Sequence, residues 1–200
     1  MPHSECTKGL YMNLILASAS PRRQELLKLF GFPFLIRVAD IDETMDPEKS
    51  AFDEVGRVSR QKALAVSREE DDIVIAADTI VVCEGIVLGK PHSEAEALQM
   101  LRLLSGRDHQ VMTGCTVLRG DSCETFTEVT DLHFRPLSER EIARYVASGE
   151  PMDKAGAYGI QGGAALFCQR MVGDYYNVMG LPLCRLGQIL SQIAPEIMEE

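Results

Sequence analysis

The segment from Asp72 to Cys83 is the most apolar stretch of the chain and places the strongest limit on how it can fold. β-branched residues dominate the segment, and it lacks helix caps. Such a run is typical of a strand that is buried inside a sheet. The fold must therefore cover this strand with other apolar elements. A Glu84-Gly85 turn follows it, so residues 86–88 are expected to return as a hairpin.

Asp78 interrupts this apolar segment at its middle. A carboxylate that is buried there without a partner would cost several kcal/mol. Either the strand bends and exposes Asp78, or a cation or metal ion compensates its charge. An isolated aspartate in a strand is more often structural than catalytic, but complementary groups recur near the ends of other predicted elements. These groups are Glu43, Lys62 and Lys90.

A Ser-Ala-Ser-Pro-Arg-Arg motif at 18–23 joins a predicted strand to a predicted helix. Ser20 is a suitable N-cap for that helix, and the proline fits its first position. Arg22 and Arg23 then fall in the first turn, where the helix dipole disfavours a cation by about 0.3–1 kcal/mol. An anion bound by backbone N–H groups, by the hydroxyls of Ser18 and Ser20 and by both guanidinium groups would explain this placement. The alternative is a capped surface helix whose arginines point into water.

Composition excludes several classes of partner. The formal net charge is −10, which argues against a general binder of nucleic acid or of anionic membranes. An anionic ligand must then be held by a local cluster of cations. No segment is apolar enough to span a bilayer, and the first residues show no secretory signal. We expect one domain over residues 1–200, with a polar extension at 1–11.

The cysteines and histidines give no indication of a structural metal or disulfide framework. The six cysteines form no Cys-x-x-Cys pair, and the four histidines lack metal-ligand spacing. Reduced thiols are therefore favoured over disulfides or a zinc site, and a cytoplasmic location is expected.

Periodicity and capping residues predict the remaining elements. Strands are expected at 12–16, 34–38, 109–118 and 123–134, and in a segment that ends near Phe167; helices are expected at 21–31, 50–68, 93–104 and 138–149, and after Pro182. On the 50–68 helix, the predicted inward face comprises Phe52, Val55, Ser59, Ala63 and Val66. Lys62 lies at the edge of that face, as either a buried cation or a stem whose ammonium group reaches water.

The glycine-rich segment at 149–162 forms a third cluster of polar residues. Its glycines allow close approach of a ligand to the backbone, and Asp153 and Lys154 offer a charge pair. Gln161 can donate to and accept from one edge of a ligand, as base recognition requires. An ordinary polar loop residue is the alternative for this glutamine.

Taken together, these cations and carboxylates suit phosphoryl chemistry. Cations neutralise charge on phosphate oxygens, carboxylates hold a divalent ion, and one carboxylate orients or deprotonates water. The chain has neither a Walker-type loop nor a Gly-x-Gly-x-x-Gly motif after a strand. The phosphates are therefore expected to be held by side chains and by the start of the 21–31 helix.

The ordered set of motifs resembles the Maf family of nucleoside triphosphate pyrophosphatases, also called septum formation inhibitor homologues. The matching stretches are 17–26, 61–63, 77–81, 89–91, 104–106 with His109, 149–162, 173–175, Asn177 and 180–183. They follow the family order over residues 14–190. The resemblance implies an α/β fold with an elongated, bent mixed sheet, flanking helices and a cleft between two lobes, similar to that of inosine triphosphate pyrophosphatases.

The resemblance also implies a hydrolase that cleaves a nucleoside triphosphate between its α and β phosphates. Asp78 would accept the proton of the attacking water, with Glu43, Lys62 and Lys90 as its companions in the site. We expect Glu43 and Asp78 to hold Mg²⁺ or Mn²⁺ as the cofactor. A homodimer is a further family expectation.

Three residues match positions that the family associates with substrate choice. These are Arg22, Thr79 and Gln161, and they look like the branch that acts on dTTP and UTP, with modified pyrimidine nucleotides as further candidates. The alternative branch acts on 7-methyl-GTP. In the mechanism that we expect, Arg22, Arg23 and the amides after the N-cap hold the triphosphate tail, assisted by the two lysines.

Two functions from other classes compete with this hypothesis. A nucleotide-binding regulator of cell division would need the phosphate cluster but not the carboxylates Asp78 and Glu43. A protein-interaction module would leave the arginines at the helix start unexplained. The presence of both carboxylates therefore favours the enzyme.

Overall fold

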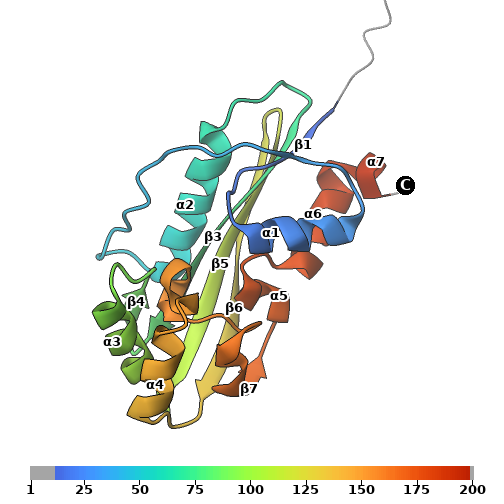
Figure 1. Cartoon of the computed structure of the whole chain (residues 1–200). Coiled ribbons are helices and arrows are strands. Elements are labelled where there is room, and N and C mark those ends of the chain that lie inside the picture. The colour runs from blue at the N-terminus through green and yellow to red at the C-terminus, as the bar shows by residue number, and fades with distance from the viewer. Residues whose placement is uncertain (1–11, 199–200) are drawn as a thin grey trace, which may run out of the picture.

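The structure is a computed structural model that describes residues 12–198. Seven strands form one mixed sheet in the order β2-β1-β3-β5-β6-β7, with β4 paired to β3 (Figure 1). Helices lie against the sheet on both sides, and the long strands β3, β5 and β6 run along the length of the molecule. This confirms the predicted α/β class and mixed sheet. The expected extension at 1–11 lies outside the described residues.

The bounds of the elements follow in chain order. The strands are β1 Leu14–Leu16, β2 Leu35–Ile36, β3 Ile73–Cys83, β4 Ile86–Leu88, β5 Asp108–Arg119, β6 Ser122–Phe134 and β7 Cys168–Val172. The α-helices are α1 Pro21–Leu27, α2 Ala51–Ala65, α3 Glu94–Leu104, α4 Glu139–Val146, α5 Tyr175–Met179, α6 Leu183–Ile193 and α7 Pro195–Met198. Four 3₁₀ helices are η1 Lys28–Phe30, η2 Glu150–Asp153, η3 Ala155–Ala157 and η4 Gly163–Leu166.

Several predicted elements differ from the observed ones. The strand expected to end near Phe167 is wrong, because residues 163–166 form η4 and β7 begins only at Cys168. The 50–68 helix ends at Ala65, where the chain turns into extended backbone. Phe52 does not face inward but is 47% exposed. The first turn of α2 contacts β6 through its backbone, because the Phe52 carbonyl accepts a hydrogen bond from the Thr127 hydroxyl.

Helix α2 lies unusually close to the sheet. Gly114 of β5 pairs with Asp78 of β3, and a Cβ atom at Gly114 would stand 2.3 Å from the Val55 carbonyl oxygen of α2. A contact of that length is possible only for glycine. This approach places the last turn of α2, and with it Lys62, beside the middle of β3.

Side chains on one face of β3 contribute to two separate hydrophobic cores, and there is a gap between these cores. On one face, Ile75 and Ala77 pack in a core with α1 and α6. Further along the same face, Val81 and Cys83 pack in a second core with α3 and α4. Thr79 stands on this face between the two cores and is only partly covered.

Asp78 points to the opposite face of β3, toward Lys62 of α2. Between Ile75, the last residue paired with β1, and Val81, the first paired with β4, this edge of β3 has no neighbouring strand among the described residues. The predicted cleft between two lobes is therefore located at this open edge in the middle of β3.

His109 lies inside the core that includes α3 and α4 and is 3% exposed. Its Nε2 atom is 3.0 Å from the Tyr158 hydroxyl, and its ring contacts Phe134 edge-on with centroids 4.7 Å apart. Burial lowers the pKa of His109 to about 4. Protonation of this imidazole therefore favours the unfolded chain, in which histidine keeps its ordinary pKa.

We expect the free energy of unfolding to fall as the pH is lowered from 6.5 to about 4. The contribution of His109 should be about 3 kcal/mol over that range. Urea unfolding at a series of pH values tests this, with His109→Gln as the comparison because its amide can keep a bond to Tyr158. A variant whose stability depends on pH as steeply as that of the wild type would contradict the assignment.

Candidate active site

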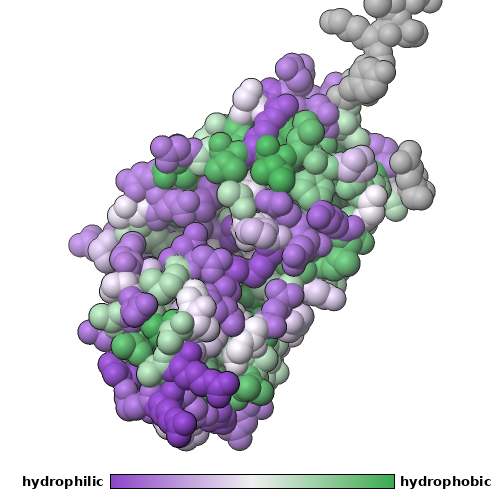
Figure 2. Space-filling model, viewed as in Figure 1, coloured by the Kyte–Doolittle hydropathy of each residue, from purple (hydrophilic) through white to green (hydrophobic). Residues whose placement is uncertain are grey.

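A cavity of about 820 Å³ lies at the gap between the two cores. Figure 2 shows the same face as a surface that is hollowed near its middle and bordered mainly by hydrophilic residues. The cavity wall combines residues from the motif at 17–23, the loop at 43–45, β3, the turn at 89–90 and the segments at 153–162 and 178–180. All of the site residues that were predicted from the sequence line this cavity.

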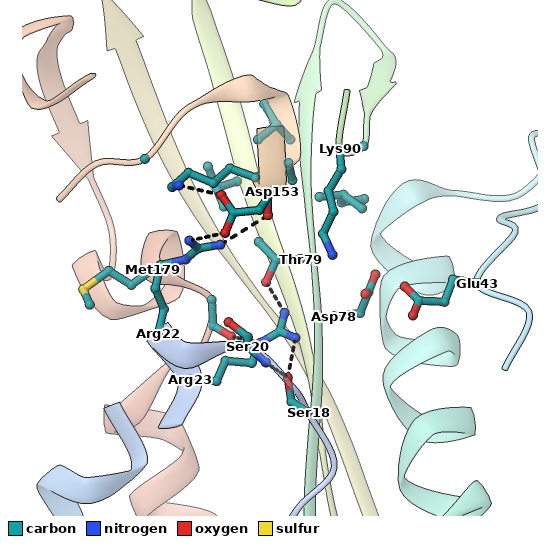
Figure 3. Close-up of a pocket in the computed structure, with 18 of the residues that line it drawn as sticks. Ser18, Ser20, Arg22, Arg23, Glu43, Asp78, Thr79, Lys90, Asp153 and Met179 are labelled. Atoms are coloured by element: carbon teal, nitrogen blue, oxygen red, sulfur yellow. Dashed lines mark hydrogen bonds and ion pairs between the residues drawn. The ribbon is translucent and has the colours of Figure 1, made fainter. Parts of the chain in front are cut away.

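Lys62 joins the two predicted carboxylates. Its Nζ atom is 2.7 Å from Asp78 Oδ1 and 2.9 Å from Glu43 Oε2. Asp78 is 9% exposed, so its charge is compensated by a cation and not by bending of the strand. The Lys62 ammonium group is therefore a buried partner and does not reach out to water as a solvated stem would. Figure 3 shows Glu43 and Asp78 pointing toward each other across this point.

The two carboxylates fit a divalent cation that is shared with a polyphosphate. Each has a second oxygen outside the ion pair with Lys62. Within residues 12–198, no group of three or more His, Cys, Asp or Glu side chains is placed to hold a metal ion. Mg²⁺ often binds through one or two carboxylates together with substrate phosphates and water. The donor set of Glu43 and Asp78 matches that kind of site.

Lys90 enters the cavity from the turn that follows β4. The turn is fixed by a hydrogen bond of 3.0 Å from the Gly156 N–H to the Gly89 carbonyl. The Lys90 side chain points toward Asp78 in Figure 3. This places a second cationic group, after Lys62, on the same side of the cavity as the carboxylates.

The two arginines of the motif have different environments. Arg23 donates to the Gly180 carbonyl (2.8 Å), the Ser18 hydroxyl (3.2 Å) and the Thr79 hydroxyl (2.9 Å). Burial lowers the pKa of Arg23, and the negative charge of Asp78 acts in the opposite direction. All three nitrogens of the Arg23 guanidinium group thus have protein acceptors, and they fix Thr79 at the cavity wall. Direct contact of Arg23 with a phosphate stays a prediction.

Arg22, unlike Arg23, reaches from α1 across the cavity to Asp153. Its Nη1 atom is 3.1 Å from Asp153 Oδ2, and its side chain is 28% exposed. Partial burial acts to raise the pKa of Asp153, but hydrogen bonding to Lys154 and the charge of Arg22 outweigh it and hold the pKa below its usual range. An anion in the cavity would compete with this carboxylate for Arg22.

The serines of the motif are used in a way that the sequence did not predict. Ser20 occupies the N-cap position of α1, but its hydroxyl makes no capping hydrogen bond. Its backbone N–H donates instead to the Ser18 hydroxyl at 3.2 Å. Because the Ser20 hydroxyl makes no capping hydrogen bond, it is available to a ligand at the cavity wall.

Some cavity residues escaped the sequence analysis. Tyr158, Met179 and Gly180 line the cavity, and none of them had been assigned a role. Helix α5 places the last two. An Asp174 N-cap and a left-handed Gly180 at its end delimit this helix, and both are sequence features that could have predicted it.

Two predictions from the sequence concern the state of the cysteines and the presence of membrane-spanning segments. Of the predicted reduced thiols, Cys83, Cys115, Cys123, Cys168 and Cys184 are free, and Cys6 lies outside the described residues. No helix between residues 12 and 198 has both the length and the apolar character needed to cross a bilayer.

Comparisons with known proteins show which family the sequence matches. A family model described as "Maf-like protein" matches residues 13–193. A dTTP/UTP pyrophosphatase of Bacillus cereus strain AH820 is 52% identical over 180 residues, which cover 90% of this chain and 94% of the relative. A dTTP/UTP pyrophosphatase of Symbiobacterium thermophilum is 54% identical over 180 residues, which cover 90% of this chain and 93% of the relative.

A solved structure of a HAM1 protein from Coxiella burnetii has the same fold at low sequence identity. The two structures superpose with a TM-score of 0.51 and 14% identity, over 90% of this chain and 99% of the HAM1 chain. This likeness supports the fold alone, and it agrees with the predicted similarity in architecture.

Proposed function

Because the chain belongs to the Maf-like protein family, we propose that it is a nucleoside triphosphate pyrophosphatase that converts dTTP and UTP to the monophosphate and pyrophosphate. The membership confirms the resemblance seen in the sequence motifs. The names of the two relatives support the choice of substrate. The observation that carries the proposal is the Lys62 ammonium group, which joins Asp78 and Glu43 in one cavity with Arg22 and Lys90.

Asp78 is the proposed general base. Lys62 binds one oxygen of its carboxylate and fixes the plane of the group. The other oxygen has two lone pairs, so it can take a proton from the water molecule that attacks the α phosphorus and still face the proposed metal ion. Burial on β3 holds this carboxylate in place, so little reorganisation is needed during the reaction.

The cations of the cavity are proposed to hold the triphosphate. Arg22 would exchange Asp153 for a phosphate oxygen, and Lys90 would approach from the opposite wall. Mg²⁺ or Mn²⁺ held by Glu43 and Asp78 would neutralise phosphate charge and polarise the attacked group. Pyrophosphate would then leave with its charge already balanced by the cations around it.

Thr79 and Gln161 are proposed to select the nucleobase of the substrate. Arg23 fixes the Thr79 hydroxyl, and Gln161 is exposed on a loop of the cavity wall. The Gln161 amide can accept from N3–H of uracil or thymine and donate to the O4 carbonyl oxygen beside it. Cytosine presents the opposite pattern at these positions, so a single amide orientation favours uracil and thymine.

The proposed function is tested with purified protein, Mg²⁺ and a panel of nucleoside triphosphates. We expect pyrophosphate and monophosphate from UTP and dTTP, and much less from ATP, GTP and CTP. Release of inorganic phosphate with a nucleoside diphosphate would contradict the proposed cleavage position. Binding of UTP without any hydrolysis would instead favour a nucleotide-binding regulator.

Arg22→Ala should raise the KM for UTP by about tenfold, since a charge-assisted hydrogen bond contributes about 1.5–3 kcal/mol. The effect on kcat should be smaller, because Arg22 is assigned to binding of the tail. Steady-state kinetics measure both constants, and Arg60→Ala on the exposed surface of α2 is the control. Unchanged KM and kcat would exclude Arg22 from the triphosphate site.

We also propose a cytoplasmic location and a homodimer. The free thiols of the described residues support a reducing compartment. The dimer is a family expectation that light scattering can test.

A further inference from the structure

Tyr145 and Glu150 lie behind the loop that carries Gln161. Tyr145 is near the end of α4, and Glu150 is the first residue of η2. Among the described residues, neither belongs to the set that lines the cavity. Any effect of this pair on a substrate must therefore act through the loop.

The pair holds the loop on both sides of Gln161. The Gly159 N–H donates to the Tyr145 hydroxyl at 3.0 Å, and that hydroxyl donates to Glu150 Oε1 at 2.8 Å. The Gly163 N–H donates to Glu150 Oε2 at 3.0 Å. Because Gly159 and Gly163 flank Gln161 at equal distances in the sequence, this chain of hydrogen bonds fixes the backbone before and after it.

The contacts between this pair and the loop are close. A Cβ atom at Gly162 would stand 2.1 Å from Glu150 Oε1, and one at Gly163 would stand 3.2 Å from the Tyr145 ring. The Tyr145 side chain is 6% exposed and its ring contacts Phe167 edge-on. Burial raises the pKa of Tyr145, so its hydroxyl stays protonated and can donate to Glu150.

Gln161 itself depends on this support. Its side chain is exposed at the cavity wall. The backbone on either side of it therefore sets the position from which its amide can reach a base. A shift of about 1 Å in a positioning element can cost up to about a hundredfold in rate.

We propose that Tyr145 and Glu150 are positioning residues for base selection, and that they orient Gln161 toward the edge of the uracil or thymine base. They do so without touching the substrate. This inference rests on the proposed function, because it assigns the Gln161 amide to the base of a pyrimidine triphosphate.

Tyr145→Phe is the sharpest test, since it removes the hydroxyl and leaves the ring packing in place. We expect kcat/KM for UTP to fall about tenfold, mainly through KM, while kcat/KM for CTP changes less than about twofold. The ratio of kcat/KM for UTP to kcat/KM for CTP should therefore decrease. Tyr175→Phe is the matched control, because it makes the same chemical change on a side chain that is 42% exposed.

A double-mutant cycle with Gln161→Ala separates positioning from a general structural effect. In the Gln161→Ala background, Tyr145→Phe should leave the ratio of kcat/KM for UTP to kcat/KM for CTP unchanged. The inference would be overturned if Tyr145→Phe alone lowered kcat/KM equally for UTP and CTP. It would also be overturned if Tyr145→Phe lowered the ratio of these two values further in the Gln161→Ala background. If Tyr145→Phe fails to fold, Glu150→Ala must lower the ratio of kcat/KM for UTP to kcat/KM for CTP instead, because it removes both of the oxygens that accept these hydrogen bonds.

The two proposals fail in different ways. A wild-type protein that releases no pyrophosphate from any triphosphate overturns the proposed function, and this inference with it. If the wild-type protein prefers UTP, and this preference is unchanged in both Tyr145→Phe and Glu150→Ala, this inference alone is overturned.

Discussion

Asp78→Asn is expected to lower kcat for UTP by at least about a thousandfold, since general base catalysis contributes about a hundredfold to ten-thousandfold and the variant also loses a proposed metal ligand. The amide cannot take a proton from water. It has nearly the same shape as the carboxylate and can still accept a hydrogen bond from Lys62, which remains paired with Glu43. The fold should therefore be retained. Pyrophosphate release measures the loss, and thermal unfolding checks the fold.

Asp153→Asn is the matched control, because it makes the same change in the same cavity. Asp153 faces Arg22 and Lys154, away from the proposed position of the attacking water. We expect its kcat to stay within about tenfold of the wild type. Near-normal pyrophosphate release by Asp78→Asn, or an equal loss in the control, would show that Asp78 is not the base.

Lys62→Met should have the second-largest effect, on both stability and turnover. It keeps most of the apolar stem but leaves Asp78 buried without a cation at 2.7 Å. Removal of one partner from a buried pair costs about 3–5 kcal/mol, and the open cavity beside Asp78 should keep the loss near the lower end. Turnover should fall by about a hundredfold or more, because the base loses the group that orients it. Urea unfolding and steady-state kinetics measure the two effects.

Lys49→Met provides the comparison for a surface pair. Its ammonium group lies 3.7 Å from Asp46, and both side chains are well exposed. Such pairs contribute less than about 1 kcal/mol, so stability and turnover should change little. If Lys62→Met were as stable and active as Lys49→Met, the buried ion pair would have no role in the site.

The sequence contained enough information for the centre of the sheet and for the composition of the cavity. The apolar run at 72–83 required a covered strand, and a carboxylate inside it required compensation, which is found. The partner of Asp78 could not be chosen from the sequence alone. That choice depends on the close approach of α2 to β5 at Gly114, which is a contact between distant segments.

The different environments of Arg22 and Arg23 could not be predicted either. The two residues are neighbours on one helix turn, and only the tertiary positions of Gly180 and Asp153 distinguish them. The error at 163–166 has a similar origin. Hydrogen bonds to Tyr145 and Glu150 hold the chain at Gly159 and Gly163, and no local pattern encodes them.

Hydrolysis of UTP in water enriched in heavy oxygen tests the central claim most directly, because it reports which phosphorus the water attacks. We expect one heavy oxygen in the uridine monophosphate and none in the pyrophosphate, and we expect Asp78→Asn to form this labelled product at least about a thousandfold more slowly. Heavy oxygen in the pyrophosphate, or in inorganic phosphate released with uridine diphosphate, would contradict the central claim.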